Sequence, residues 1–294
     1  MFGAVFSAPC LWFVFMSAHL GIGRGAPLSE SGPNTEGDPS PGSDPRLLHR
    51  VNPETVYELL DFENVTAEGD IILPTDRDAV HQIWPDYNGK VSIPFVIMPQ
   101  LSKQYNDIMA ALNMIRDSTC VTFHPRTNEA DYINFQTGYG CASLVGFTGG
   151  VQPLYVGPSC TAGNICHELM HTLGFFHEHS RQDRENYINI LYGNIIQGKE
   201  SNFLLERGDS LGLPYDLSSI LHYGSNFFSS NGQPTILPKS PGVSIGQRSH
   251  LSALDVAKVK RLYKCGESLK SFCGLRCSSV AEILKETLIS RPCP

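Results

Sequence analysis

The chain has 294 residues, of which 41% are hydrophobic and 17% charged, and its formal net charge is -7. This length and composition suit a globular protein with one sizeable core plus processing segments, or with two small domains. The acidic balance and the lack of a lysine or arginine run exclude the basic surface expected of a nucleic-acid-binding protein.

The first 25 residues are expected to form a secretory signal peptide. Residues 2–20 are apolar, and small residues follow between Gly21 and Ala26, where a signal peptidase would cut. The apolar run is short for a membrane span, so a retained anchor is the weaker alternative. The protein is therefore expected to be secreted, with storage in secretory granules left open, and no later segment resembles a membrane span.

The next stretch, residues 27–46, is rich in Pro, Gly, Ser, Asp and Glu and is expected to be disordered. A short helix is predicted for residues 47–60, with Asn52 as its N-cap and Pro53 in its first turn. The chain holds one N-glycosylation sequon, N-V-T, so Asn64 is the predicted glycan acceptor.

Regular secondary structure is predicted for the region that follows. Alternating and β-branched residues predict strands at 91–98, 120–123 and 131–135, and an amphipathic helix is predicted at 102–119. The apolar face of this helix is expected to be core, and it comprises Tyr105, Ile108, Met109, Leu112 and Ile115. Few long periodic runs occur between the histidine-rich motif described next and a capped helix that begins after Ser252, so an irregular second half is expected.

The chemistry is concentrated in the run HELMHTLGFFH, which begins at His167. On a helix, His167 and His171 lie one turn apart on the same face, so two imidazoles can bind one metal ion. Glu168 then lies beside the metal, where it can take a proton from a metal-bound water. Gly174 can end the helix at positive φ and return the chain, so that His177 supplies a third ligand.

Three histidines leave one position of a tetrahedral zinc open, which distinguishes a catalytic site from a closed structural one. One Zn²⁺ per chain is therefore expected. A bare H-E-x-x-H on an ordinary surface helix is the alternative, but the added glycine and third histidine at fixed offsets make a chance match negligible. The longer pattern is the metzincin signature.

Together with the segment 67–79, AEGDIILPTDRDA, this motif resembles the astacin family of zinc metallopeptidases, and most closely its single-domain hatching-enzyme or ovastacin-like branch. The resemblance covers about residues 67–265. It implies an α+β fold of two lobes, with a mixed twisted sheet and the long zinc helix in the N-terminal lobe and an irregular C-terminal lobe. It also implies a secreted, monomeric zinc endopeptidase that acts on protein or peptide substrates.

The resemblance further implies a zymogen. Asp70 matches the aspartate that binds zinc in place of water in the precursor, although Ala67 stands where the family has an aromatic residue. Arg77 matches the activation site, which a trypsin-like protease would cut, and Glu178 matches the glutamate near which the new N-terminus is buried. The expected segments are a signal peptide at 1–25, a propeptide at 26–77, a peptidase domain at 78–265 and a cysteine-containing tail at 266–294.

Other positions carry the resemblance with small departures. Leu221 stands where the family has methionine beneath the metal, and its similar volume should keep the apolar floor. Tyr223 matches the tyrosine that ligates zinc at rest and stabilises the tetrahedral intermediate, whereas His222 is taken as structural. Residues 140–146 resemble the sheet-edge strand that pairs with an extended substrate. Arg248 lies in the loop that walls the pocket for the residue after the scissile bond and is a candidate for binding acidic side chains, with a surface arginine as the alternative.

Nine cysteines in a secreted chain indicate disulfides, and eight remain once Cys10 leaves with the signal peptide. The resemblance pairs Cys120 with Cys265 and Cys141 with Cys160. Cys166, which directly precedes the first zinc ligand, is expected to be paired too. Its partner is left open among the tail cysteines, Cys273, Cys277 and Cys293.

The rival function is a catalytically inactive, zinc-stabilised extracellular protein that holds peptides in its cleft. At the level of single residues, Gly69 and Asp70 could form an ordinary turn, Glu178 could be a solvated charge and Tyr223 a packed core residue. The enzyme is favoured because every catalytic position is filled. The natural substrate is not indicated by the sequence.

Overall fold

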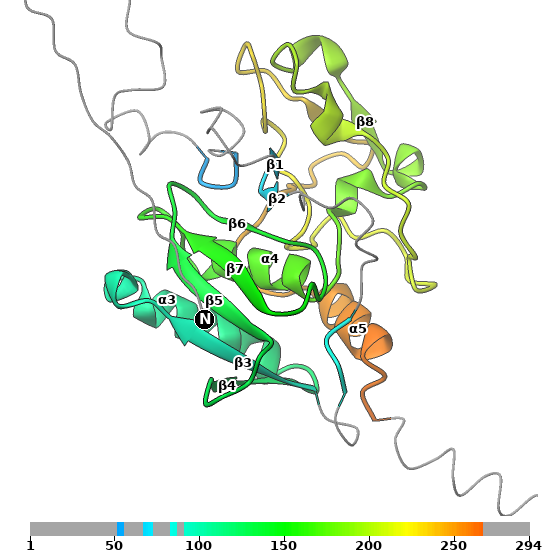
Figure 1. Ribbon diagram of the computed structural model, residues 1–294. Helices are drawn as coiled ribbons and strands as arrows, with labels where there is room; N and C mark the ends of the chain where they lie inside the picture. The colour runs from blue at the N-terminus through cyan, green and yellow to red at the C-terminus, as the bar shows by residue number, and fades with distance from the viewer. Residues whose placement is uncertain (1–51, 56–66, 73–82, 87–90, 267–294) are drawn as a thin grey trace, which may run out of the picture. The chain divides into compact units, whose positions relative to one another are not determined.

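The computed structural model describes residues 52–55, 67–72, 83–86 and 91–266, all of them in the unit Ser40–Pro294 (Figure 1). The predicted signal peptide, Asn64, Arg77 and the tail cysteines lie outside these residues. Among the residues that are described, no helix is both long and apolar enough to cross a bilayer.

A mixed seven-stranded sheet has the order β1-β2-β6-β7-β5-β3-β4 (Figure 1). Strands β3, β4, β5 and β7 pair in parallel, β6 runs antiparallel to β7, β2 pairs in parallel with β6, and β1 runs antiparallel to β2. The strands are β1 (Ala67–Glu68), β2 (Ile71–Ile72), β3 (Val91–Ile97), β4 (Val121–Pro125), β5 (Tyr132–Thr137), β6 (Ala142–Ser143) and β7 (Val151–Val156).

Helix α3 (Tyr105–Arg116) packs against α4 and the sheet, and Ile108, Leu112 and Ile115 are buried, as predicted. Tyr105 was expected in this core, but its side chain is 51% exposed. Helical side chains tilt toward the N-terminus, so the first residue of the helix projects beyond its packed surface.

Helix α4 (Ala162–Thr172) carries the histidine motif into the core. A capping box between Thr161 and Asn164 starts the helix, and nearly all of its residues are buried. It ends where Gly174 adopts a φ of 105°, and the Gly174 amide donates to His171 O. The predicted glycine break therefore redirects the chain toward His177.

The second half of the domain is irregular, as expected, and packs around its own hydrophobic cluster, which includes Phe203, Tyr223 and Phe228. A two-stranded sheet and α5, capped by Ser252 with Asp255, are its main regular elements. The remaining bounds are η1 (Pro99–Leu101), η2 (Glu178–Ser180), η3 (Arg184–Asn186), β8 (Ile188–Ile190), η4 (Tyr192–Asn194), η5 (Glu200–Phe203), β9 (Ile236–Pro238) and α5 (Ala253–Leu262).

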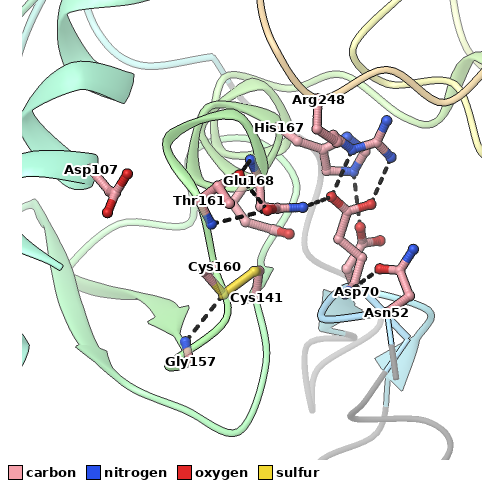
Figure 2. Close-up of a disulfide and its surroundings, with 12 residues drawn as sticks. Asn52, Asp70, Asp107, Cys141, Gly157, Cys160, Thr161, His167, Glu168 and Arg248 are labelled. Carbon is pink, nitrogen blue, oxygen red and sulfur yellow. Dashed lines mark hydrogen bonds and ion pairs between the residues drawn. A yellow bond between two sulfur atoms is a disulfide. The ribbon is translucent and has the colours of Figure 1, made fainter. Parts of the chain in front are cut away.

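Two disulfides tie these elements together. Cys120–Cys265 joins the start of β4 to the chain after α5, and Cys141–Cys160 joins the start of β6 to the loop before α4 (Figure 2). The expectation that Cys166 is paired is wrong, because its thiol is free and buried within the main core. Burial raises the pKa of this thiol, with a further contribution from Asp255, so it does not compete for the metal as a thiolate.

Candidate metal centre

Four buried ligand atoms converge from three segments of the chain. His167 and His171 project from α4, His177 follows the glycine break, and Asp70 comes from the turn between β1 and β2. The Nε2 atom of His171 lies 2.9 Å from that of His167 and 3.2 Å from that of His177. The Asp70 carboxylate oxygens lie 2.9 Å from Nε2 of His167 and 2.9 Å from Nε2 of His177.

The backbone fixes which nitrogen of each ring faces the centre. Nδ1 of His167 lies 2.7 Å from Ile220 O, and Nδ1 of His171 lies 2.6 Å from Phe175 O. A carbonyl oxygen only accepts hydrogen bonds, so each Nδ1 carries the proton and each neutral ring points an Nε2 lone pair inward. Burial lowers the pKa of His171 well below its usual value and also lowers that of His177, which favours neutral rings.

This donor set fits a cation. Burial opposes ionisation of Asp70, but the neighbouring His177 and His167 outweigh it and hold the pKa of the carboxyl well below its usual value. Among the described groups, neither Asp70 oxygen has a hydrogen-bond partner. Lone pairs that face one another in a buried space repel unless a positive charge lies between them. Three imidazole nitrogens and one carboxylate oxygen are a donor set typical of zinc.

Glu168 lies beside this centre on α4, in the position expected of a general base. Its Oε2 accepts a hydrogen bond from Ser143 Oγ at 3.0 Å, and its buried Oε1 has no hydrogen-bond partner among the described residues. Burial raises the pKa of Glu168 well above its usual value, and the nearby carboxylates of Asp70 and Glu54 raise it further.

The turn beneath the metal holds the tyrosine expected at the site. Leu221 is fully buried there, and the ring of Tyr223 lies 4.5 Å from that of His177 and stacks at 3.9 Å on His179. Gly69 has a φ of 65°, and a Cβ atom on it would lie 2.3 Å from the Tyr223 hydroxyl oxygen. Gly69 therefore packs directly against the Tyr223 hydroxyl, while the Asp70 side chain faces the three histidines.

His222 is held by two neighbours. Its Nε2 lies 2.8 Å from Tyr215 Oη and its Nδ1 lies 2.8 Å from Tyr223 O. Burial lowers the pKa of His222 to about 4. A neutral ring bonded at both nitrogens is a structural residue, as the sequence suggested, and it fixes the backbone of the adjacent tyrosine.

The strand edge predicted to receive a substrate is covered in this structure. Residue Ile71 of β2 pairs in parallel with Ser143 of β6, and the Ser143 amide donates to Asp70 O at 3.0 Å. The chain's own β1–β2 hairpin thus takes the place at the sheet edge that an added strand would use.

Arg248 is mostly buried rather than a surface residue. Its Nε and Nη2 donate to the two carboxylate oxygens of Glu54 at 2.6 Å each. Burial opposes the charge, but the Glu54 carboxylate outweighs it and raises the pKa of Arg248. Glu54 was not singled out from the sequence, because an isolated glutamate after Asn-Pro carries no signal that it will contact an arginine so distant along the chain.

Glu178 is buried, which excludes a solvated charge. It forms an ion pair with Lys258, a second with Arg181 at 3.2 Å, and it accepts from the Asp216 amide at 2.8 Å. A cavity of about 420 Å³ lies beside it and is lined in part by Leu221 and the two basic residues. Lys258 was missed from sequence because α5 returns to the site from far along the chain.

The comparisons with known proteins agree with this geometry. The model of the astacin peptidase family matches residues 77–264, more than half of the chain. The chain belongs to the astacin family of zinc metalloendopeptidases. It is 36% identical over 282 residues to an astacin-like metalloendopeptidase of Mus musculus, covering 88% of this chain and 63% of that protein. It is also 36% identical over 231 residues to the low choriolytic enzyme of Oryzias latipes, covering 74% of this chain and 83% of that protein.

A solved structure gives the same assignment. High choriolytic enzyme 1, a hatching enzyme zinc-protease from Oryzias latipes, matches with a TM-score of 0.60 and 39% sequence identity, over 62% of this chain and 94% of that one. The expected astacin-like α+β fold is confirmed. The cluster of three histidines and Asp70 could hold the one zinc ion of this astacin-family chain, and Asp70 lies N-terminal to the region that the family model matches.

Proposed function

We propose that this chain is a secreted zinc endopeptidase made as a zymogen, in which Asp70 keeps the site silent. One observation supports this most strongly: a carboxylate delivered by a hairpin outside the matched peptidase region meets all three histidines. A carboxylate held against the three histidines would fill the place that the nucleophilic water needs. The segment 26–77 is the proposed propeptide, and its removal after Arg77 would open the site.

The chemistry would follow from residues already in place. Zinc, once bound by the three histidines, would supply a Lewis acid that lowers the pKa of water to about 7. Glu168 accepts the proton of the attacking water at Oε1 and passes it to the leaving amine. The Tyr223 hydroxyl donates to the oxygen on which negative charge develops. An extended protein or peptide substrate pairs with β6 once β2 has left, and Arg248 binds an acidic side chain after the scissile bond.

Loss of the propeptide would also lower the pKa of Glu168 toward its usual value, so that the carboxylate can act as a base. Asp70 and Glu54 are two of the causes that raise the pKa of Glu168, and both leave with residues 26–77. Cleavage by a trypsin-like protease frees Asp78 or Ala79, and the new N-terminus binds near Glu178 beside the 420 Å³ cavity. The two disulfides suit the proposed extracellular location. We also propose a glycan at Asn64 in the precursor and a monomeric mature enzyme.

The decisive experiment compares processed wild-type protein with Glu168→Ala. Chelator-sensitive hydrolysis of a denatured protein should fall by roughly 10³-fold or more, while zinc content measured by mass spectrometry is unchanged. Glu185→Ala, which removes an exposed carboxylate, is the matched control. Equal activity in wild type and Glu168→Ala would exclude Glu168 as the general base. No activity in either protein with zinc bound would favour the inactive peptide-binding protein.

Latency has its own test. Asp70→Ala should raise the hydrolytic activity of the uncleaved precursor, because it opens the fourth position at the metal. A precursor that stays silent after this change would show that the aspartate is not the switch.

A further inference from the structure

Glu54 places a second buried carboxylate beside the metal centre. Its two oxygens accept hydrogen bonds from Nε and Nη2 of Arg248, and Oε1 also accepts one from Asn164 Nδ2 at 2.6 Å. We propose that Glu54 is a second latch of the precursor, and that it occupies the carboxylate-binding place to which Arg248 and Asn164 donate. This inference rests on the proposed function, in which the segment carrying Glu54 is removed.

The guanidinium is fixed before any ligand arrives. Nη1 of Arg248 donates to His222 O and to Gln247 O, each at 3.0 Å. The Arg248 backbone lies against α4 so closely that a Cβ atom on Gly163 would lie 1.7 Å from Arg248 O. Arg248 is thus attached both to the zinc helix and to the turn that bears the catalytic tyrosine. The other two donors of the guanidinium, Nε and Nη2, both point toward the Glu54 carboxylate.

Asn164 is oriented by the cap of α4. Its Oδ1 accepts from the Thr161 amide at 3.0 Å and from Thr161 Oγ1 at 2.6 Å. With the oxygen used in this way, the amide nitrogen must face outward, toward Glu54. The subsite therefore offers three N–H donors in a fixed arrangement, and a carboxylate is the group that accepts from all three.

The carboxylate is delivered by an ordered turn. The Glu54 amide donates to Asn52 Oδ1 at 2.9 Å, and the Thr55 amide donates to Asn52 O at 3.0 Å. The Cys141 amide donates to Pro53 O at 2.9 Å, which docks the turn at the start of β6. Asp70 docks farther along the same edge, through Ser143. Two carboxylates of one segment thus bind two separate sites.

Two attachments make the latch stronger than either one alone. When the segment shifts at Asp70, Glu54 still holds it near the cleft, so Asp70 rebinds as an intramolecular ligand. When Glu54 leaves, Arg248 remains as a buried charge without its acceptor, which is unfavourable. Both sites must therefore be released before the cleft stays open.

The first test measures docking without any catalysis. In the intact zinc-loaded precursor, Glu54→Gln should speed hydrogen exchange of the Cys141 and Thr55 amides by about 10- to 100-fold, because an ionic hydrogen-bonded pair is lost. Arg248→Gln should act alike, and the double variant should exchange no faster than either single one. Glu129→Gln, at a half-buried glutamate bonded to His124, should leave both amides unchanged.

A second variant guards against misfolding. Glu54→Asp keeps the charge but shortens the side chain, so it should give an intermediate exchange rate. Wild-type exchange at Cys141 in both Glu54 variants would overturn the proposal.

The second test asks whether the pair acts as a latch. Uncleavable precursors carrying Arg77→Gln and Asp70→Ala are compared with and without Glu54→Gln, and the added change should raise peptide hydrolysis by about tenfold. Faster exchange with unchanged hydrolysis would overturn the latch and leave a structural ion pair. If processed wild-type protein hydrolyses nothing, the proposed function fails, whereas the exchange result still decides whether Glu54 occupies the subsite.

Discussion

Gly69→Ala should weaken the aspartate latch without touching the mature enzyme. Gly69 has a φ of 65°, a conformation that costs a residue with a side chain about 1–2 kcal/mol. The new methyl group would also lie 2.3 Å from the Tyr223 hydroxyl, whose ring is buried and stacked on His179 and so cannot easily move. Such overpacking costs about 1–3 kcal/mol.

Together these costs amount to about 2–5 kcal/mol against the docked hairpin. Since each 1.4 kcal/mol corresponds to a factor of ten, the open fraction of the precursor should rise by at least about 30-fold. The assay is chelator-sensitive hydrolysis of a quenched peptide by precursor made uncleavable with Arg77→Gln. Gly232→Ala is the control, because Gly232 has a φ of 75° with open space around it. A Gly69→Ala precursor as silent as this control would refute the reasoning.

Three further predictions concern residues around the site. Cys166 should resist alkylation in the native zinc-loaded protein and react only on unfolding, as followed by mass spectrometry, because it is fully buried and burial raises its thiol pKa. Leu221→Met should change the free energy of unfolding by less than about 1.5 kcal/mol in urea titrations and leave peptide hydrolysis unchanged, since the volumes are similar. The pKa of His222 falls from 6.5 to about 4 on folding, so the unfolded chain binds a proton there more readily. The contribution of His222 to stability is therefore present above pH 6.5 and is lost as the pH falls toward 4. The free energy of unfolding from urea titrations should therefore fall with acidification less steeply in His222→Gln, by up to about 1.4 kcal/mol per pH unit.

The sequence predicted those helices and helix ends that depend on interactions between residues close together in the chain. The period of the apolar residues predicted α3, the capping pair predicted the start of α5, and Gly174 predicted the end of α4. Tyr105 shows the limit of this reasoning, because periodicity assigns a face but not how far the packed surface extends. Cys166 shows a second limit: even counts of cysteine suggest pairing, whereas a buried thiol behaves as an ordinary apolar side chain.

The residues of the site likewise fall into those that the sequence could place and those that it could not. The three histidines and Glu168 could be placed from sequence because one helix and one glycine turn set their spacing. The contacts of Glu54 with Arg248 and of Lys258 with Glu178 could not, because each joins residues distant in the chain through the tertiary fold. Charge alone does not say which of many acidic and basic residues will meet.

The backbone around Asp70 accounts for how the proposed zymogen would keep its inhibitory segment without cutting it. The group that faces the three histidines is a side-chain carboxylate, which offers no scissile bond. The peptide carbonyl of Asp70 instead accepts a hydrogen bond from Ser143 on β6. The same serine donates through its hydroxyl to Glu168, which carries a raised pKa in this state. In the proposed zymogen the hairpin would therefore take the place of the water, occupy the strand edge and disfavour the ionised base, and all three effects would end when it leaves.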